Sequence, residues 1–145
     1  MSDESHLPPE SRDPEPSVRD ERPPAVVFFA HGSRDATWRA AIDRIAARAR
    51  AVHCGPVLTA FLEHVEPSLP DACAAAIAAG ARRIVIVPLF IASGAHLRED
   101  LPRITAAVRA RHPEVSLRAV DAAGEADVVQ AAIVEFALHA ARAAD

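Results

Sequence analysis

Short apolar runs alternate with longer amphipathic stretches along most of this chain. The runs AVVFFA, PVLTAFL and ARRIVIVPLF are nearly continuous and rich in β-branched residues, which predicts strands buried on both faces. A fourth run, VSLRAV, is weaker and alternating, as expected of an edge strand. Apolar positions at helical spacing predict helices over about 36–52 and 97–111, an alanine-rich helix ending at Gly80, and a last helix ending near Arg142.

The alternation of strand and helix predicts the fold class. Four β-α units in succession favour an α/β fold, with a four-stranded parallel sheet and helices on both of its faces. A flavodoxin-like spatial order of second, first, third and fourth strand would place the first strand between the second and the third. The residues that follow these three strands would then lie together at one edge of the sheet.

The first 24 residues differ from the rest of the chain. They hold six of the twelve prolines and carry seven acidic residues against three arginines, so they account for the whole formal charge of −4. They contain no apolar run, which excludes a signal peptide or a membrane span within them. Their composition predicts a disordered acidic segment at 1–24, followed by a single α/β domain over 25–145.

Several classes of function are disfavoured by composition. The body has as many basic as acidic residues and few aromatics, which argues against nucleic-acid binding. No apolar stretch is long enough to cross a bilayer. Cys54 and Cys73 are too few for a disulfide framework and are not in metal-binding spacing. We therefore expect a cytoplasmic protein with reduced thiols.

Potential metal ligands follow three of the predicted strands. His31 comes directly after AVVFFA, Glu63 follows PVLTAFL, and His96 ends the short loop IASGAH after the third strand. Two imidazoles and a carboxylate are a ligand set for borderline divalent metals. Because neighbouring strands lie ~4.8 Å apart and ligands bind at the carboxyl ends of parallel strands, the three side chains can converge on one ion.

Each of these residues also has a purely structural interpretation. His31 alone is equally consistent with a turn histidine bonded to the backbone, and Glu63 with a carboxylate at a helix start. His64 follows Glu63 directly, so the two side chains should normally point apart. His64 could support a metal ligand or lie at the surface, and the surface position is favoured. Three further histidines lie where they can meet the C-terminal end of a helix dipole: His53, His112 and His139.

Three segments together resemble a known family. HGSRD after the first strand, FLEHVEPSLPDA at the second and ARRIVIVPLFIASGAHLREDLP at the third are similar to the class II tetrapyrrole chelatases. The resemblance is strongest to the small CbiX-type sirohydrochlorin cobaltochelatases and their ferrochelatase relatives, and it covers about 25–117. The acidic N-terminal segment departs from the family pattern, and the histidine-rich run of some relatives is missing.

This resemblance implies a flavodoxin-like chelatase half-unit that inserts a divalent metal into a tetrapyrrole. It implies that His31 and His96 bind the metal and assist deprotonation of the macrocycle, and that Glu63 is a third ligand. The metal would be Co²⁺, with Fe²⁺ or Ni²⁺ as alternatives that ligand type does not decide. No cofactor beyond the substrate metal is expected, and the small size of the unit implies a homodimer.

Further residues beside the same edge are candidates for binding the tetrapyrrole. Sirohydrochlorin carries many carboxylates, and arginine is well suited to hold them. The arginines are equally well explained as solvated surface residues. The candidate substrate-binding residues are Ser33, Arg34, Ser93, Gly94 and Arg98.

Two other functions remain open from the sequence. A non-catalytic module for metal binding or delivery would use the same His31 and His96. A hydrolase with Ser33 as its nucleophile is disfavoured, because HGSRD is not a G-x-S-x-G elbow and no acid follows in triad order.

Overall fold

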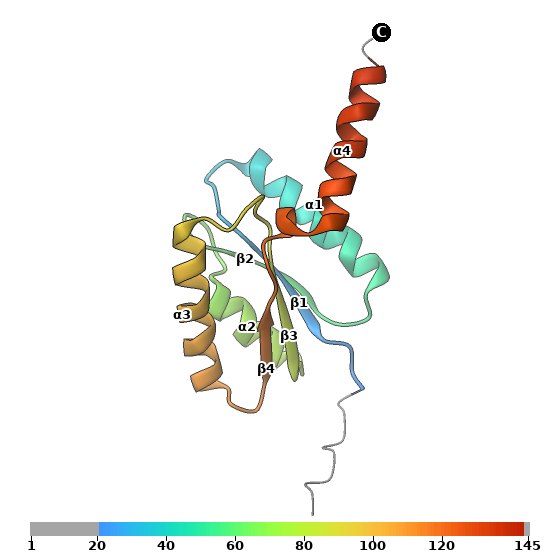
Figure 1. The fold of residues 1–145 in the computed structure, drawn as a ribbon. Helices are drawn as coiled ribbons and strands as arrows, with labels where there is room; N and C mark the ends of the chain where they lie inside the picture. The colour runs from blue at the N-terminus through green and yellow to red at the C-terminus, as the bar shows by residue number, and fades with distance from the viewer. Residues whose placement is uncertain (1–20, 144–145) are drawn as a thin grey trace, which may run out of the picture.

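The computed structural model describes residues 21–143, and of His96 it describes the backbone. Its centre is a four-stranded, all-parallel sheet with the strand order β2-β1-β3-β4 (Figure 1). The predicted fold class, strand order and edge position of the fourth strand are confirmed. The strands are β1 (Ala25–Ala30), β2 (Val57–Phe61), β3 (Arg83–Pro88) and β4 (Ser116–Ala119).

Helices cover both faces of the sheet. The side chains of α2 and α3 form the larger core cluster with alternate residues of all four strands, while α1 packs with Ala30 and Phe61 on the opposite face. A short 3₁₀ turn, η1, leads into the last helix. The helices are α1 (Ala36–Val52), α2 (Leu69–Ala78), α3 (Ala95–Arg111), η1 (Ala123–Glu125) and α4 (Asp127–Arg142).

Local sequence explains how the first two helices begin. The Asp35 carboxylate accepts a hydrogen bond from the Thr37 N–H at 2.8 Å and caps α1. The Ser68 hydroxyl caps α2 by accepting from the Asp71 N–H at 3.3 Å. Both helices thus start where a short polar side chain satisfies amides that lack a partner within the helix.

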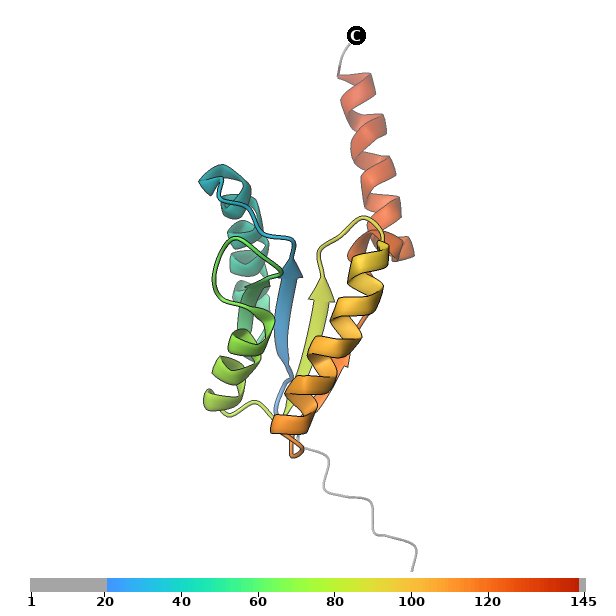
Figure 2. The ribbon, with the colours of Figure 1, turned by 90° about the vertical axis from the view of Figure 1, so that its left-hand side faces the viewer.

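Two helices differ from the expectation. α3 begins at Ala95 rather than near Leu97, and Pro102 lies inside it. α4 has no buried residue and extends away from the sheet instead of packing on it (Figures 1 and 2). Over residues 21–143, none of the helices combines the length and apolarity that crossing a membrane requires.

One cysteine is part of the core. Cys73 on α2 is fully buried, and burial raises the pKa of its thiol to about 11. It therefore stays neutral and packs as a small apolar side chain. Cys54 is a free, exposed thiol.

The N-terminal segment is described only from residue 21, so the disorder expected of residues 1–20 lies outside the described part. Its last residues contact the body. The Arg22 carbonyl accepts a hydrogen bond from Arg83, and the Pro24 carbonyl lies 2.8 Å from the His53 Nε2. Arg22 and Pro24, at the end of the N-terminal segment, are therefore tied to the domain by their backbone carbonyls.

Candidate metal-binding pocket

The backbone itself brings His31 and Glu63 together. Hydrogen bonding between β1 and β2 continues beyond the last residue of β2, with Leu62 N–H donating to Ala30 O at 2.9 Å and Glu63 N–H donating to His31 O at 3.0 Å. The two candidate ligands are thus neighbours across parallel chains, as their strand-end positions predict. Their spacing is set by the register of the sheet.

Gly32 makes this close approach possible. Its φ of +98° lies in the left-handed region, and a Cβ at this position would come within 1.9 Å of the Glu63 carbonyl oxygen. Any side chain would force the two chains apart. The glycine of the HGS segment therefore holds the backbone geometry on which the His31–Glu63 pair depends.

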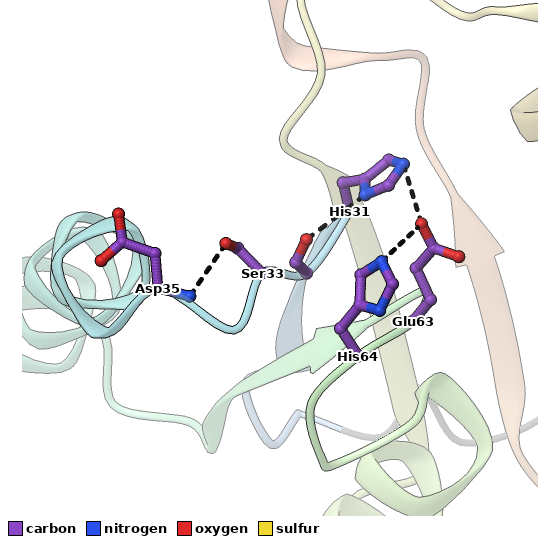
Figure 3. Close-up of polar contacts among 6 residues, drawn as sticks. His31, Ser33, Asp35, Glu63 and His64 are labelled. Atoms are coloured by element: carbon purple, nitrogen blue, oxygen red, sulfur yellow. Dashed lines mark hydrogen bonds and ion pairs between the residues drawn. The ribbon is translucent and has the colours of Figure 1, made fainter.

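The His31 ring is placed so that one nitrogen can face a metal. Its Nδ1 lies 3.3 Å from Gly32 O, and the tautomer protonated at Nδ1 donates there, which leaves a lone pair on Nε2. Nε2 lies 3.4 Å from Glu63 Oε1 (Figure 3). Two ligands of one tetrahedral ion with bonds of ~2.1 Å are separated by about 3.4 Å. The pair therefore has the spacing of two ligands that share an ion.

His64 lies beside Glu63, contrary to the expectation that the two side chains point apart. Its Nε2 is 3.1 Å from Glu63 Oε1 (Figure 3). The expectation assumed an extended strand, but β2 ends at Phe61, and the chain turns at His64 with a φ of 71° and a Val65 N–H to Glu63 O hydrogen bond. This γ-turn returns the His64 ring to the carboxylate.

A pocket of about 780 Å³ opens at this edge of the sheet. His31 and Glu63 line it, whereas His64 lies outside it beside Gly32 in a shallower hollow. The pocket is of the size of ordinary small-molecule sites. Its other walls are mainly apolar and come from the β2 end, the β3–α3 loop and one side of α3: Leu62, Phe90, Ala92, Gly94, Ala95, Leu97, Asp100, Arg103 and Ile104.

His96 is the second residue of α3, and its side chain lies outside the described part of the structure. The two residues before it, Gly94 and Ala95, line the pocket. Its backbone position is therefore at the wall that faces His31 and Glu63. Among the described side chains, no group of three or more His, Cys, Asp or Glu is placed to hold a metal ion. The centroids of the His31 and His64 rings are 6.5 Å apart.

The candidate substrate-binding residues are distributed over several places. Gly94 lines the pocket, whereas Ser93 and Arg98 line a neighbouring cavity of about 500 Å³ between α3 and β4. Arg34 lies in the hollow beside His64. The Ser33 hydroxyl accepts a hydrogen bond from the Asp35 N–H at 3.1 Å and so belongs to the turn that starts α1.

The arginine in the pocket is one that the sequence analysis missed. Arg103 lines it beside Asp100, to which it donates a hydrogen bond at 2.8 Å. Positions 96, 100 and 103 follow the four-and-three spacing of one helix side, while position 98 lies on the other side. This periodicity, counted from His96, was the signal available in the sequence.

The fold and the pocket define the class of protein: an α/β domain that presents imidazole and carboxylate groups at the carboxyl edge of a parallel sheet. The family model described as CbiX matches residues 25–140, and the chain belongs to this family. The sirohydrochlorin cobaltochelatase of Methanocaldococcus jannaschii is 33% identical over 89 residues, which are 61% of this chain and 62% of that protein. That of Methanopyrus kandleri is 35% identical over 81 residues, 55% of this chain and 57% of that protein. The chain thus matches about three fifths of the length of these relatives.

Solved structures show the same architecture. The cobalamin biosynthesis CbiX protein from Marinobacter aquaeolei VT8 superposes with a TM-score of 0.76 at 28% identity, over 85% of this chain and 98% of that one. The sirohydrochlorin chelatase SirB from Bacillus subtilis subspecies spizizenii, in complex with cobalt, gives a TM-score of 0.63 at 27% identity. That match covers 69% of this chain and 43% of SirB.

Proposed function

We propose that this protein inserts a divalent metal, Co²⁺ in the first place, into sirohydrochlorin. The observation that carries the proposal is the His31–Glu63 pair, held at ligand spacing by the sheet register and facing a pocket large enough for a planar organic substrate. The naming of similar proteins as sirohydrochlorin cobaltochelatases and of SirB as a chelatase supports the same reaction.

The groups in the pocket meet the chemical needs of metal insertion. A dication enters the macrocycle and two pyrrole N–H protons leave it, so the site must hold the metal weakly and accept protons. We assign His31, Glu63 and His96 to the metal. Neutral imidazole is both a ligand and a proton acceptor near physiological pH, and the Glu63 carboxylate balances the charge of the metal. His31 and His96 are the proposed proton acceptors, each at the ring nitrogen that is freed when the metal leaves for the macrocycle.

The rest of the pocket suits a flat, polycarboxylate ring. Leu62, Phe90 and Leu97 supply apolar surface, and Arg103 supplies a guanidinium at the pocket wall. Gly94 leaves space for the ring, since nothing lies within 4 Å of where its Cβ would be. Arg103 is therefore our first candidate for binding substrate carboxylates, and Arg34, Arg98, Ser33 and Ser93 are candidates only for a substrate that extends beyond the pocket.

The metal and the setting are further parts of the proposal. Imidazole and carboxylate ligands accept Co²⁺, Fe²⁺ and Ni²⁺ alike, so metal supply and ring shape would choose among them. We expect no cofactor besides the substrate metal. We place the reaction in the cytoplasm, where the exposed Cys54 thiol would stay reduced.

An anaerobic absorbance assay tests the proposal. Purified protein is mixed with sirohydrochlorin and Co²⁺, Fe²⁺ or Ni²⁺, and the spectral change on metal insertion is followed against a protein-free control. We expect a protein-dependent increase in rate, largest with Co²⁺. Binding of Co²⁺ without any acceleration would identify a metal-delivery module and would contradict the chelatase proposal.

We also propose that the protein acts as a homodimer assembled through α4. Val129, Ile133, Phe136 and Ala140 recur at helical spacing and form one apolar side of this helix, and Phe136 is 74% exposed. An isolated helix of this length is marginally stable in water, so α4 needs a packing partner.

The same molecule offers a complementary surface. α1 packs against β2, and Val85 and Val87 on the same side of β3 are only partly buried. A groove of about 290 Å³ lies at the root of α4 and is lined by Val87, Val120 and Val129 among others. Beyond this root, α4 extends away from the sheet (Figure 2). A second copy can place its α4 on this surface and receive α4 in return, as a twofold dimer requires.

The dimer is tested by light scattering on the purified chain. We expect a dimer for the wild type and a monomer for Phe136→Glu. Glu135→Gln, away from the Phe136 side of the same helix, is the matched control and should remain dimeric. A monomeric wild type at micromolar concentration would contradict the proposal.

A further inference from the structure

The loop between β3 and α3 is anchored to the sheet at its start, where the Leu89 N–H donates to Phe29 O at 2.7 Å and Phe90 packs against the core. It carries the pocket-lining residues Phe90, Ala92 and Gly94 and leads to the start of α3. From Ile91 to Gly94 its side chains are small or exposed, Ile91 being 74% exposed, and nothing lies within 4 Å of the Cβ position of Gly94. Contacts from outside the loop must therefore fix the conformation of residues 91–94.

The turn η1 makes that contact through its backbone. The Gly124 N–H donates to the Phe90 carbonyl at 2.9 Å. A Cβ at Gly124 would lie 2.2 Å from the Ile91 carbonyl oxygen and 2.4 Å from its Cα. The turn and the loop thus pack backbone against backbone, at a distance that only glycine allows.

Glu125 adds a bidentate side-chain contact. Its Oε1 accepts from the Ser93 N–H at 3.0 Å and its Oε2 from the Ser93 hydroxyl at 3.1 Å. These hydrogen bonds, with a smaller contribution from the Arg98 guanidinium, lower the pKa of Glu125. Arg98 in turn donates to the Ser93 carbonyl, so Ser93 is held at its amide, its hydroxyl and its carbonyl.

The turn η1 is itself held by a side chain of α4 and by a hydrogen bond of its own backbone. The Gln130 side chain on α4 donates to the Gly124 carbonyl at 3.0 Å, and the Glu125 N–H donates to Ala122 O at 2.9 Å. Glu125 does not line the 780 Å³ pocket; it lines the groove at the root of α4. It therefore reaches the pocket through Ser93 and not by direct contact.

We propose that Glu125 is a positioning residue for the metal-binding pocket, and that with Gly124 it fixes the β3–α3 loop and the start of α3. The proposal rests on the function proposed above. Glu125 sets where residues 90–96 stand relative to His31 and Glu63, while its own carboxylate takes no part in the chemistry. Loss of this contact changes the geometry of the site and leaves the sheet intact.

The test compares Glu125→Ala and Glu125→Gln with the control Glu114→Ala, an exposed carboxylate near the start of β4. Glu125→Ala should lower kcat for metal insertion roughly tenfold and raise the apparent KM for the metal, because displacement of one side of a site by about 1 Å is costly. The KM for sirohydrochlorin should rise less than that for the metal, since Leu62 and Arg103 in the same pocket are untouched. Glu125→Gln keeps one acceptor for the Ser93 amide and should recover part of the loss.

Amide hydrogen exchange separates this proposal from the function itself. Exchange at Ser93 should accelerate in Glu125→Ala and not in Glu114→Ala, whether or not the protein inserts metal. An inactive wild type with this exchange pattern would reject the chelatase and keep the contact between turn and loop. The positioning role would be overturned if the wild type is active and Glu125→Ala keeps the wild-type KM for the metal and the wild-type kcat. Equal losses in Glu125→Ala and Glu125→Gln, with unchanged KM values and reduced melting temperature, would also overturn it.

Discussion

The two walls of the pocket are held in different ways. On the side of β1 and β2, His31 and Glu63 are joined by backbone hydrogen bonds that continue the sheet. On the side of β3 and α3, the loop is held by a turn some thirty residues further along the chain, through Gly124 and Glu125. The first wall is part of the sheet, and the second depends on a few contacts added to it.

This difference has a physical consequence. The register of a buried parallel sheet is strongly specified, so the first wall can change only if the fold changes. The loop of the second wall is held mainly by hydrogen bonds to exposed groups, each of which contributes little to stability. Substitutions that disturb the backbone of the first wall should therefore affect both stability and activity, whereas substitutions at the contacts of the second wall should affect activity more than stability.

The largest effect on stability is expected at Gly32. Gly32→Ala adds a side chain at a positive φ and against the Glu63 carbonyl, which should destabilise the fold by roughly 3 kcal/mol and lower the melting temperature by roughly 10 °C. Gly94→Ala is the matched control for stability, because its position is open and its φ is −67°. Thermal melting of both variants checks this. Equal melting temperatures for the two alanine variants would show that the first wall is not set by the close approach at Gly32.

A smaller effect is expected at Glu63. Glu63→Gln removes the negative charge beside His31 and keeps the shape of the side chain, so the melting temperature should change little because the group is half exposed. The apparent KM for the metal should rise roughly tenfold, while binding of sirohydrochlorin should remain near the wild-type level. Titration of each substrate at saturation of the other checks this. Weaker ring binding with unchanged metal dependence would make Glu63 a substrate contact instead.

The smallest effect is expected at the N-terminal segment. Removal of residues 1–20 should leave the melting temperature and the insertion rate unchanged, because these residues lack the apolar side chains that would offset the entropy of ordering. Removal of residues 1–24 should lower the melting temperature by a few degrees, since it also removes the bonds to Arg83 and His53. A large loss on removal of 1–20 alone would show that the segment packs on the domain.

The same contrast explains what could be predicted from the sequence. The strands, their order and the position of His31 beside Glu63 follow from apolar runs and the residues that end them, because sheet geometry converts strand ends into neighbours. The His64 contact was predicted wrongly, because it depends on a γ-turn at a non-glycine residue that no local pattern indicates.

Other features had no signal in the chemistry of single residues. The contact of Glu125 with Ser93 joins two polar residues 32 positions apart, and such a long-range pair has no periodicity to reveal it. The exposure of α4 was missed because its apolar spacing predicts burial, which the isolated chain does not provide. Arg103 in the pocket, by contrast, was accessible from its helical spacing to position 96.

We propose that a metal ion passes to the tetrapyrrole at the His31–Glu63 edge of the sheet. The most direct measurement is anaerobic Co²⁺ insertion into sirohydrochlorin by the wild type and by His31→Ala, with melting temperatures recorded on the same samples. His31 is an exposed polar residue at the sheet edge, so its truncation leaves no core cavity and the variant should melt like the wild type. This proposal implies a rate for His31→Ala at least roughly a hundredfold lower than that of the wild type. A well-folded His31→Ala variant that inserts Co²⁺ at the wild-type rate would contradict it.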